Sequence, residues 1–334
     1  MRFLIGLCLV AGLLWSGWWA LASYGLTTAV TAWLDERRTE GWQADVSAIE
    51  TSGFPWDINK RLNDLALADP ETGVAIRMDQ ISLSTATHWP GFARVRLPQT
   101  PIELAVPGDK SAVTFENGLV ALDLHPGTEL QLDRLAWTAD AWTIANARGD
   151  VLDAGGLVLS MEQSEDDPAT YAVTVNAPDA APGQAIRDAL RIPADWPLTF
   201  DQFAVSADVT FDQPWDRTAI EDARPQPRVI KLKLAEASWA ELRLNLAADL
   251  TVDDAGIPEG RLNVQARNWP LMLDLAERTG VLPPALKVQA ERGLTSLAQL
   301  NGNPNTLDVQ INFAGGLMAV GIFPIGPAPR LVLR

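Results

Sequence analysis

Side chains that could carry acid–base or metal chemistry are present in this 334-residue chain, but they form no recognisable motif. Its two histidines, His88 and His125, lie near no G-x-S-x-G sequence and have no metal-ligand spacing. The acidic pairs in Glu165–Pro168 and at Asp253-Asp254 stand in turn-forming sequence, so we interpret them as solvated turn residues. A glycosidase pair could still be formed by acids that are distant in sequence, because such pairs are defined by their separation in space. We therefore expect a non-enzymatic protein with no cofactor and no metal.

Charge and cysteine content exclude further classes of protein. The formal net charge is -16 and the pI is about 4.5, so the chain would repel a phosphate backbone and we expect no nucleic-acid partner. Cys8 is the single cysteine, which rules out an intrachain disulfide. The bulky Leu7 before it is unlike the small residue of a lipoprotein signal, so we interpret Cys8 as a small hydrophobic residue.

The N-terminal segment is the strongest signal in the sequence. Residues Phe3 to Leu34 carry no charge, and about 20 apolar residues suffice for a membrane-spanning helix. Arg2 precedes this run, whereas the following segment Asp35–Arg38 is neutral overall, which by the positive-inside rule places the N-terminus in the cytoplasm. The sequence therefore predicts a single-pass membrane protein with an extracytoplasmic C-terminal domain.

A cleaved signal peptide is the alternative, and it stays open at this point. Residues Ala20 to Ala22 match the small-x-small cleavage pattern, although the apolar run before them is longer than usual. We predict an anchor with an amphipathic stalk over residues 1–42, or a signal peptide that ends at residue 22. A β-rich extracytoplasmic domain follows over residues 43–334, and a division into two lobes is expected near residues 178–197.

Alternation of apolar and polar residues predicts strands throughout the later part of the chain. It is nearly strict over 203–211, 241–253, 261–267 and 307–313, and Asx, Gly and Pro clusters separate these runs. Strands that are apolar on one face and polar on the other are typical of antiparallel sheets. We therefore predict a mainly β fold of the α+β kind. It has long, curved antiparallel sheets and a few helices, at 184–190, 218–223, 271–279 and 284–300.

The clearest alternation also identifies a candidate binding surface. If its apolar side is open, it forms a groove for acyl chains, and if it is closed, it forms an ordinary core. The residues assigned to this candidate groove are Leu242, Leu244, Leu246, Leu250, Val264, Val309 and Ile311.

The stretch Gly53-Phe54-Pro55 precedes the first long strand pattern. Gly53 lets the backbone leave the stalk, and Pro55, which has no N–H, fits the first residue of a strand. The apolar positions then change parity near Leu62, which predicts a bulge. We expect this stretch to lead the anchor into the first strand of the sheet.

The chain combines a basic N-terminus, a single span, an early SGFPW motif and the tail NFAGGLMAVGIFPIGPAPRLVLR. In these features it resembles an uncharacterised family of bacterial envelope proteins known as a domain of unknown function. The tail contributes Pro324, Gly326 and Pro327 to the motifs that carry the resemblance. More loosely, the plan is similar to the AsmA-like proteins, which are implicated in moving lipids across the envelope. The resemblance implies binding or transfer of membrane lipids. The alternative function is an envelope scaffold that binds other proteins through a closed β core.

Overall fold

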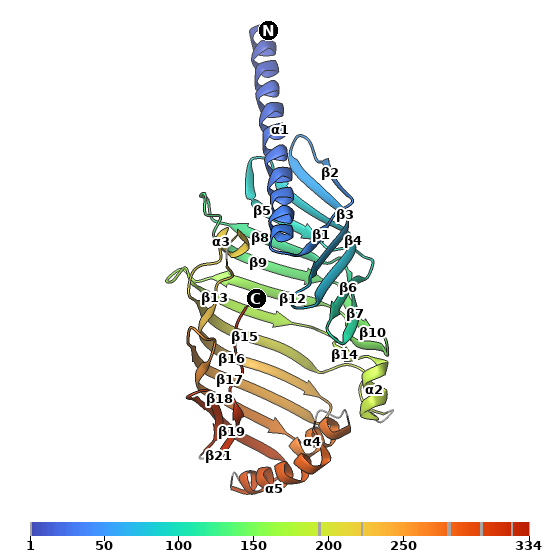
Figure 1. Ribbon diagram of the computed structural model, residues 1–334, viewed down its shortest axis with the longest axis vertical. Helices are drawn as coiled ribbons and strands as arrows, with labels where there is room; N and C mark the ends of the chain where they lie inside the picture. Colours follow the sequence, from blue (N-terminus) through green and yellow to red (C-terminus); the bar gives the residue numbers. More distant parts are fainter. Residues whose placement is uncertain are drawn as a thin grey trace. The chain divides into compact units, whose positions relative to one another are not determined.

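The longest element of the structure, a computed structural model, is the N-terminal helix α1 (Arg2–Thr39) (Figure 1). The structure describes residues 2–192, 195–221, 223–278, 282–300, 303–321 and 323–333. Within these residues, α1 is the one helix that is long and apolar enough to cross a bilayer. The predicted N-terminal helix and its extension beyond the apolar run are confirmed.

Strands dominate the rest of the described chain, and all 21 of them belong to one large antiparallel sheet. The predicted fold class, mainly β with a few helices, is confirmed. The chain divides into two compact units, the first comprising residues 1–140 and 144–147 and the second residues 141–143 and 148–334. The division predicted near residues 178–197 falls inside the second of these units.

The first unit contains α1 and the first nine strands. Strand β3 pairs with β1 and β2 at one edge and with β4 at the other. Strand β4 pairs in turn with β5 and β6, and the pairs β6–β7, β5–β8 and β8–β9 complete the ladder. The strand bounds are β1 (Gln43–Asp45), β2 (Ala48–Ser52), β3 (Asp57–Asp69), β4 (Val74–Ala86), β5 (Trp89–Arg96), β6 (Ile102–Val106), β7 (Asp109–Glu116), β8 (Leu119–Leu124) and β9 (Leu132–Ala139).

The parity change predicted near Leu62 falls at Asp64. Side chains at Ile58 and Leu62 are buried on one parity of β3, whereas Leu65 is buried on the other. Asp64 between them is exposed and has a left-handed backbone with φ 50°. One residue in this conformation reverses the side of the strand that faces the protein interior, because side chains otherwise alternate strictly.

Residues 53–56 do not begin the first strand, so the prediction for this stretch is wrong on that point. Strands β1 and β2 precede it, and residues 53–56 form the turn between β2 and β3. The prediction that position 53 needs the backbone freedom of glycine holds. The φ of Gly53 is 102°, and an added Cβ would lie 2.6 Å from the carbonyl oxygen of Asp57. The four residues of this turn, 53–56, carry no charge, which suits a turn that lies against the apolar helix α1.

Helix α1 packs on β3 through a buried lysine. The side chain of Lys60 is 1% exposed, and its ammonium group donates to the hydroxyls of Ser23 at 3.0 Å, Thr27 at 2.6 Å and Thr51 at 2.7 Å. These acceptors are neutral, so the cost of removing the charge from water is not offset by an opposite charge. Burial accordingly lowers the pKa of Lys60 below its usual value.

The second unit is a ladder of long strands with helices at its turns. Its strands are β11 (Gly149–Ala154), β12 (Leu157–Gln163), β13 (Thr170–Asn176), β14 (Ala181–Pro182), β15 (Gln202–Phe211), β16 (Pro227–Trp239), β17 (Leu242–Val252), β18 (Pro258–Arg267), β19 (Thr306–Ala314), β20 (Leu317–Val320) and β21 (Phe323–Pro327). Strand β10 (Ala141–Asn146) is shared between the two units. The strands β12, β13, β15, β16, β17, β18 and β19 pair in that order, each antiparallel to the next.

Four helices interrupt this ladder, at the places that the sequence predicts. They are α2 (Gln184–Leu190), α3 (Thr218–Glu221), α4 (Trp269–Arg278) and α5 (Pro284–Leu300). Asp222 and Thr279, which the sequence assigned to two of these helices, lie outside the described residues.

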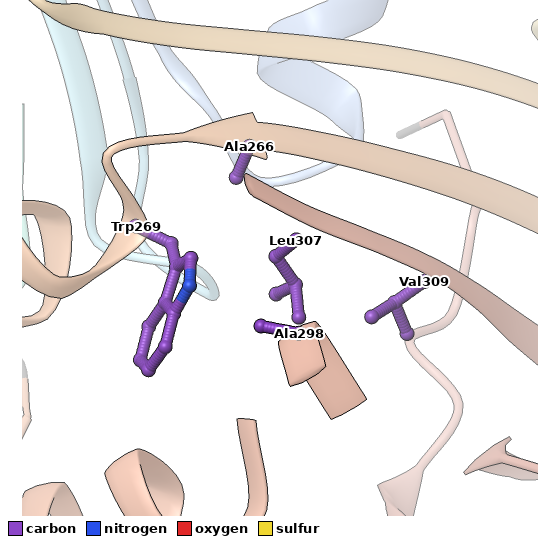
Figure 2. Close-up of a cluster of buried hydrophobic side chains, with 5 residues drawn as sticks. All are labelled: Ala266, Trp269, Ala298, Leu307 and Val309. Atoms are coloured by element: carbon purple, nitrogen blue, oxygen red, sulfur yellow. The ribbon is translucent and has the colours of Figure 1, made fainter. Parts of the chain in front are cut away.

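A buried cluster joins α4 and α5 to the sheet (Figure 2). Trp269 at the start of α4 is 4% exposed, and its indole N–H donates to the carbonyl oxygen of Pro304 at 3.0 Å. Ala298 of α5 is fully buried against Leu307 and Val309 of β19. The two helices therefore cover the sheet where β19 lies.

Candidate functional site: an apolar face of the second unit

The residues that the sequence assigned to a groove lie together on one face of β17, β18 and β19. Leu246 is directly opposite Val264, which is directly opposite Val309. Because directly opposed residues of paired strands point to the same face, the register makes one continuous surface. The other members reach it by alternation along the strands: Leu242, Leu244 and Leu250 on β17 and Ile311 on β19.

This surface extends over seven strands in two adjacent rows, and the sequence-based assignment included only part of it. One row consists of Leu159, Val175, Val205, Ala235, Leu246, Val264 and Val309. The next row consists of Met161, Val173, Ala207, Leu232, Ala248, Leu262 and Ile311. Every member is apolar. The missed residues on β12 and β13 have the same period-2 signal in a shorter run, but only strand pairing shows that they continue these rows.

Burial varies across the apolar face: Leu242 and Leu250 on β17 and Ala207 on β15 are buried, at 8%, 9% and 8% exposure. Val309 on β19 is 8% exposed beneath α5, and Leu244 and Ile311 also pack against the cluster under the two helices. Leu246 and Val264 are only partly buried, as are the members of the same row on β12, β13, β15 and β16. A ligand of apolar character would therefore meet accessible side chains over most of the row.

The opposite face of the same strands is polar, and its residues range from half-buried, as Glu236 and Asn245, to exposed, as Gln265 and Asp308. A parallel row there contains Glu236, Asn245, Gln265 and Asp308. Ion pairs join Lys233 to Asp208 at 2.6 Å and Arg243 to Glu236 at 3.8 Å, at sites open to solvent. Such pairs contribute little to stability but keep this face wet. The contrast gives the second unit one apolar side and one aqueous side.

The first unit has a hollow of its own, which sequence reasoning missed. It has a volume of about 560 Å³ and is lined mainly by small apolar side chains of β3, β4, β6 and β7, with Arg77, Glu103 and Lys110 among the lining residues. Alanines such as Ala66, Ala68, Ala75, Ala105 and Ala112 form its wall. No sequence signal could have identified it, because the hollow forms only when the strands assemble.

A polar hollow of about 450 Å³ in the first unit contains three arginines. Arg61 and Arg96 lie on either side of Ser82 across β3, β4 and β5. Arg94 in the next row is held by Asp123 at 3.0 Å, and Arg61 lies 3.6 Å from Glu50. The hollow combines guanidinium and hydroxyl donors, which are the groups that bind phosphate and carboxylate oxygens.

The motif residues lie at the ends of strands and not on the apolar face. Gly53, Phe54 and Pro55 form the β2–β3 turn described above. Pro324, Gly326 and Pro327 belong to β21, which pairs with β20, and the two prolines are exposed. Pro in a strand is compatible with an exposed edge, because it has no N–H to donate to a neighbouring strand.

The acidic residues that the sequence placed in turns do lie in turns. The carboxylate of Asp167 accepts hydrogen bonds from the Thr170 hydroxyl at 2.6 Å and the Ala169 amide at 3.1 Å, and these lower the pKa of Asp167. Asp253 similarly accepts from the amides of Ala255 and Ile257. These carboxylates close turns, which is the interpretation made from the sequence.

Comparison with known proteins gives the family. Residues 19–329 match the model of a family described as an uncharacterized protein conserved in bacteria (DUF2125). The chain belongs to this family. Searches of curated proteins and of solved structures found no match. The matched region begins at Trp19 in α1, so it includes the second half of that helix, the 53–56 turn and the whole apolar face.

Proposed function

We propose that this DUF2125 protein is a non-enzymatic lipid-binding protein of the bacterial envelope. Helix α1 anchors it in the inner membrane with the N-terminus in the cytoplasm, and the β-rich part lies in the periplasm. The apolar face of the second unit holds acyl chains. The observation that carries this proposal is the pair of apolar rows across seven strands, which α4 and α5 cover at the end formed by β17, β18 and β19.

The dimensions of the face suit a long hydrocarbon chain. Seven strands are separated by six spacings of about 4.8 Å, so each row is about 29 Å long. Each methylene group that leaves water for such a surface contributes about 0.8 kcal/mol, so contact along a row retains a lipid without polar recognition. The partly buried state of Leu246 and Val264 favours this function over a closed core.

Contacts on both sides of the Ala20–Ala22 motif support an uncleaved anchor. Before it, the indole N–H groups of Trp18 and Trp19 donate to carbonyl oxygens of Thr87 and Asp57. After it, Ser23 accepts from Lys60. Cleavage would remove the first set of contacts and leave the second at a new N-terminus. The orientation follows from Arg2 and the positive-inside rule.

The wider analogy with AsmA-like proteins extends the proposal from lipid binding to lipid transfer, and it stands on architecture alone. The alternative, a scaffold that binds envelope proteins, is favoured by the closed cluster under α4 and α5. That cluster covers one end of the face only, so we rank lipid binding first.

The test is the lipid that copurifies with the full-length protein, measured by mass spectrometry after extraction from a detergent-washed preparation. Leu246→Asp places a carboxylate in the middle of the accessible row, where it is expected to abolish most of the bound lipid. The matched control is Asn263→Asp on the exposed polar face of β18, next to Val264. It adds the same charge on the wet side and should leave lipid occupancy unchanged.

A folded Leu246→Asp protein with the wild-type amount of lipid, or a wild-type protein without lipid, would contradict the proposal. Circular dichroism of both variants establishes that they fold. Unfolding of Leu246→Asp alone would favour a dry core at that position and hence the scaffold.

A further inference from the structure

Contacts between α1 and the strands of the first unit begin well inside the apolar run of the helix. Twelve residues separate Phe3 from Trp15, the first residue with a hydrogen bond to a strand or turn, and this corresponds to about 18 Å at 1.5 Å per residue. The hydrocarbon core of a bilayer is about 30 Å thick. A helix that enters the hydrocarbon core at Phe3 is still inside the core at Trp15. The part of the first unit that contacts Trp15 therefore lies at a depth within the hydrocarbon. In Figure 1 the N-terminal part of α1 extends beyond the strands of this unit.

Two turns lie at this level: the turn of residues 53–56 and the β4–β5 turn, where the carbonyl oxygen of Thr87 accepts from the indole N–H of Trp18 at 3.0 Å. The indole N–H of Trp15 donates to the carbonyl oxygen of Pro55 at 2.9 Å, and that of Trp19 to the carbonyl oxygen of Asp57 at 2.8 Å. The ring of Trp15 lies 6.2 Å from that of Trp56, and the ring of Trp19 lies 5.5 Å from that of Phe54. Trp19 is about 24 Å along the helix from Phe3, so the turn of residues 53–56 lies about 6–12 Å inside the hydrocarbon boundary.

Three carbonyl oxygens of this turn accept hydrogen bonds. Irregular backbone at membrane depth is tolerated only where its polar groups are satisfied by protein or water. The carbonyl oxygen of Gly53 accepts from the amide of Asp57, that of Trp56 from the amide of Thr87, and that of Pro55 from Trp15. Pro55 itself has no N–H to satisfy.

The side chains of the turn are apolar, and two of them are largely exposed although they contact α1. Phe54 is 56% exposed and Trp56 is 72% exposed, and the turn carries no charge. The first charges on β3 are Asp57 and Lys60, and the ammonium group of Lys60 meets α1 at Ser23, about 30 Å from Phe3. Asp57 lies at the level of Trp19, about 6 Å inside the boundary, and Lys60 lies at the boundary itself.

We propose that the turn of residues 53–56, together with Trp15, Trp18 and Trp19, is embedded in the outer hydrocarbon layer of the membrane leaflet on the side of the β-rich part, directly below the interface. The occupant of this exposed aromatic surface is the lipid bilayer itself, because the surface continues the apolar surface of a helix long enough to span it. Aromatic rings are enriched at the interface that borders this level. The inference rests on the anchor of the proposed function and is independent of lipid binding by the second unit. It assigns a role to the Gly-Phe-Pro-Trp motif, which fixes the depth and orientation of the first unit against the membrane.

Single nitroxide labels on the full-length protein in phospholipid vesicles test this inference. Cys8 is the single native cysteine, so Cys8→Ala provides the background. Labels are placed through Trp56→Cys in the turn, Leu13→Cys on the exposed face of α1 and Glu71→Cys in the exposed β3–β4 turn. Positions 56 and 71 flank the two ends of β3, which are about 40 Å apart, so they form a matched pair.

Collision with dissolved oxygen reports lipid, and collision with a water-soluble nickel complex reports water. The ratio of oxygen to nickel accessibility is expected to be severalfold higher at position 56 than at position 71 and to approach the value at position 13. Phe54→Cys repeats the measurement at a second position of the turn. A water-like ratio at positions 54 and 56 with a lipid-like ratio at position 13 would overturn the inference while the anchor stands. A water-like ratio at position 13 would overturn the anchor, and with it both proposals.

Discussion

Helices cover the sheet by different chemistry in the two units. In the first unit, α1 meets β3 through hydrogen bonds: tryptophan indoles donate to carbonyl oxygens, and the buried Lys60 donates to three hydroxyls. In the second unit, α4 and α5 cover β19 with an apolar cluster around Trp269 and Leu307. The contacts of α1 are with carbonyl oxygens of turns and with a lysine, so they are polar, whereas the α4–α5 pair is held to the sheet mainly by buried apolar area.

Lysine side chains show the same difference. Lys60 in the first unit has no carboxylate among its hydrogen-bond partners and has a lowered pKa. Lys287 on α5 contacts Asp274 at 2.6 Å and Glu277 at 2.7 Å, both on α4. Hydrogen bonds from Lys287, first to Asp274 and then to Glu277, raise its pKa. Lys60 is buried in a contact between a helix and the sheet, whereas Lys287 links α4 and α5 by ion pairs at their surface.

The largest expected effect tests the apolar cover of the second unit. Trp269→Ala removes the largest side chain of the buried cluster and the indole donor to Pro304. We expect a loss of about 3–5 kcal/mol in the free energy of unfolding, as is typical of Trp→Ala in a core. Urea unfolding followed by circular dichroism measures it.

Trp56→Ala is the control from the first unit, because Trp56 is 72% exposed. In detergent its free energy of unfolding should stay within about 0.5 kcal/mol of the wild type. Equal losses of unfolding free energy in Trp269→Ala and Trp56→Ala would mean that the two units are stabilised in the same way. The contrast drawn between their helix–sheet contacts would then be wrong.

Secondary structure was predictable where local signals were long and regular. The bounds of α2 and α5 were read from helical spacing and flanking proline, and β17 from strict alternation at Leu242 to Val252. The 53–56 turn was misassigned because Phe54 and Trp56 continue the alternation of β3. In the structure their rings contact Trp19 and Trp15 of α1, a partner distant in sequence that no local pattern encodes.

The candidate site was predictable in part for the same reason. Leu246, Val264 and Val309 were placed on one face because each strand alternates strictly. The order of seven strands, the cover by α5 and the alanine-lined hollow of the first unit depend on which strands pair. Pairing is decided by turns and long-range contacts, and a sequence pattern of period 2 is unchanged when the register shifts by two residues.

An intermediate effect is expected at the glycine of the 53–56 turn. In Gly53→Ala the added Cβ would lie 2.6 Å from the Asp57 carbonyl oxygen and 2.7 Å from the Asn59 side-chain nitrogen, at φ 102°. We expect a loss of about 1–3 kcal/mol. The Asp57 oxygen also accepts from Trp19, so the shift should loosen α1, which protease accessibility of the turn would report.

Gly41→Ala separates steric clash from backbone strain. Gly41 has a similar φ of 94°, but an added Cβ there meets no atom within 4 Å. It should lose less stability than Gly53→Ala and leave protease accessibility of the turn unchanged. The same loss in both variants would show that only the backbone conformation matters and that the turn is not tightly held against β3.

The smallest effects concern pH, and they have opposite signs in the two units. The pKa of Lys60 is lowered in the folded state from 10.5, so the unfolded chain binds more protons between the lowered value and 10.5. Stability should therefore rise with pH across that window. For Lys287 the folded pKa is raised, so its contribution is fully present below 10.5 and is lost as pH rises above 10.5.

Subtracting the unfolding free energy of Lys60→Met or Lys287→Met from that of the wild type, at each pH from 8 to 11.5, isolates each lysine. The difference for Lys60 should rise up to about pH 10.5, and that for Lys287 should be flat there and fall above it. Methionine keeps the length of the stem in both variants, so packing changes little and the pH dependence comes from the charge. A flat Lys60 difference would mean that its ammonium group remains hydrated, and that α1 does not close over β3 at Ser23 and Thr27. In that case Lys60 would no longer mark the membrane boundary on the first unit, and the depth proposed for the 53–56 turn would lack that support.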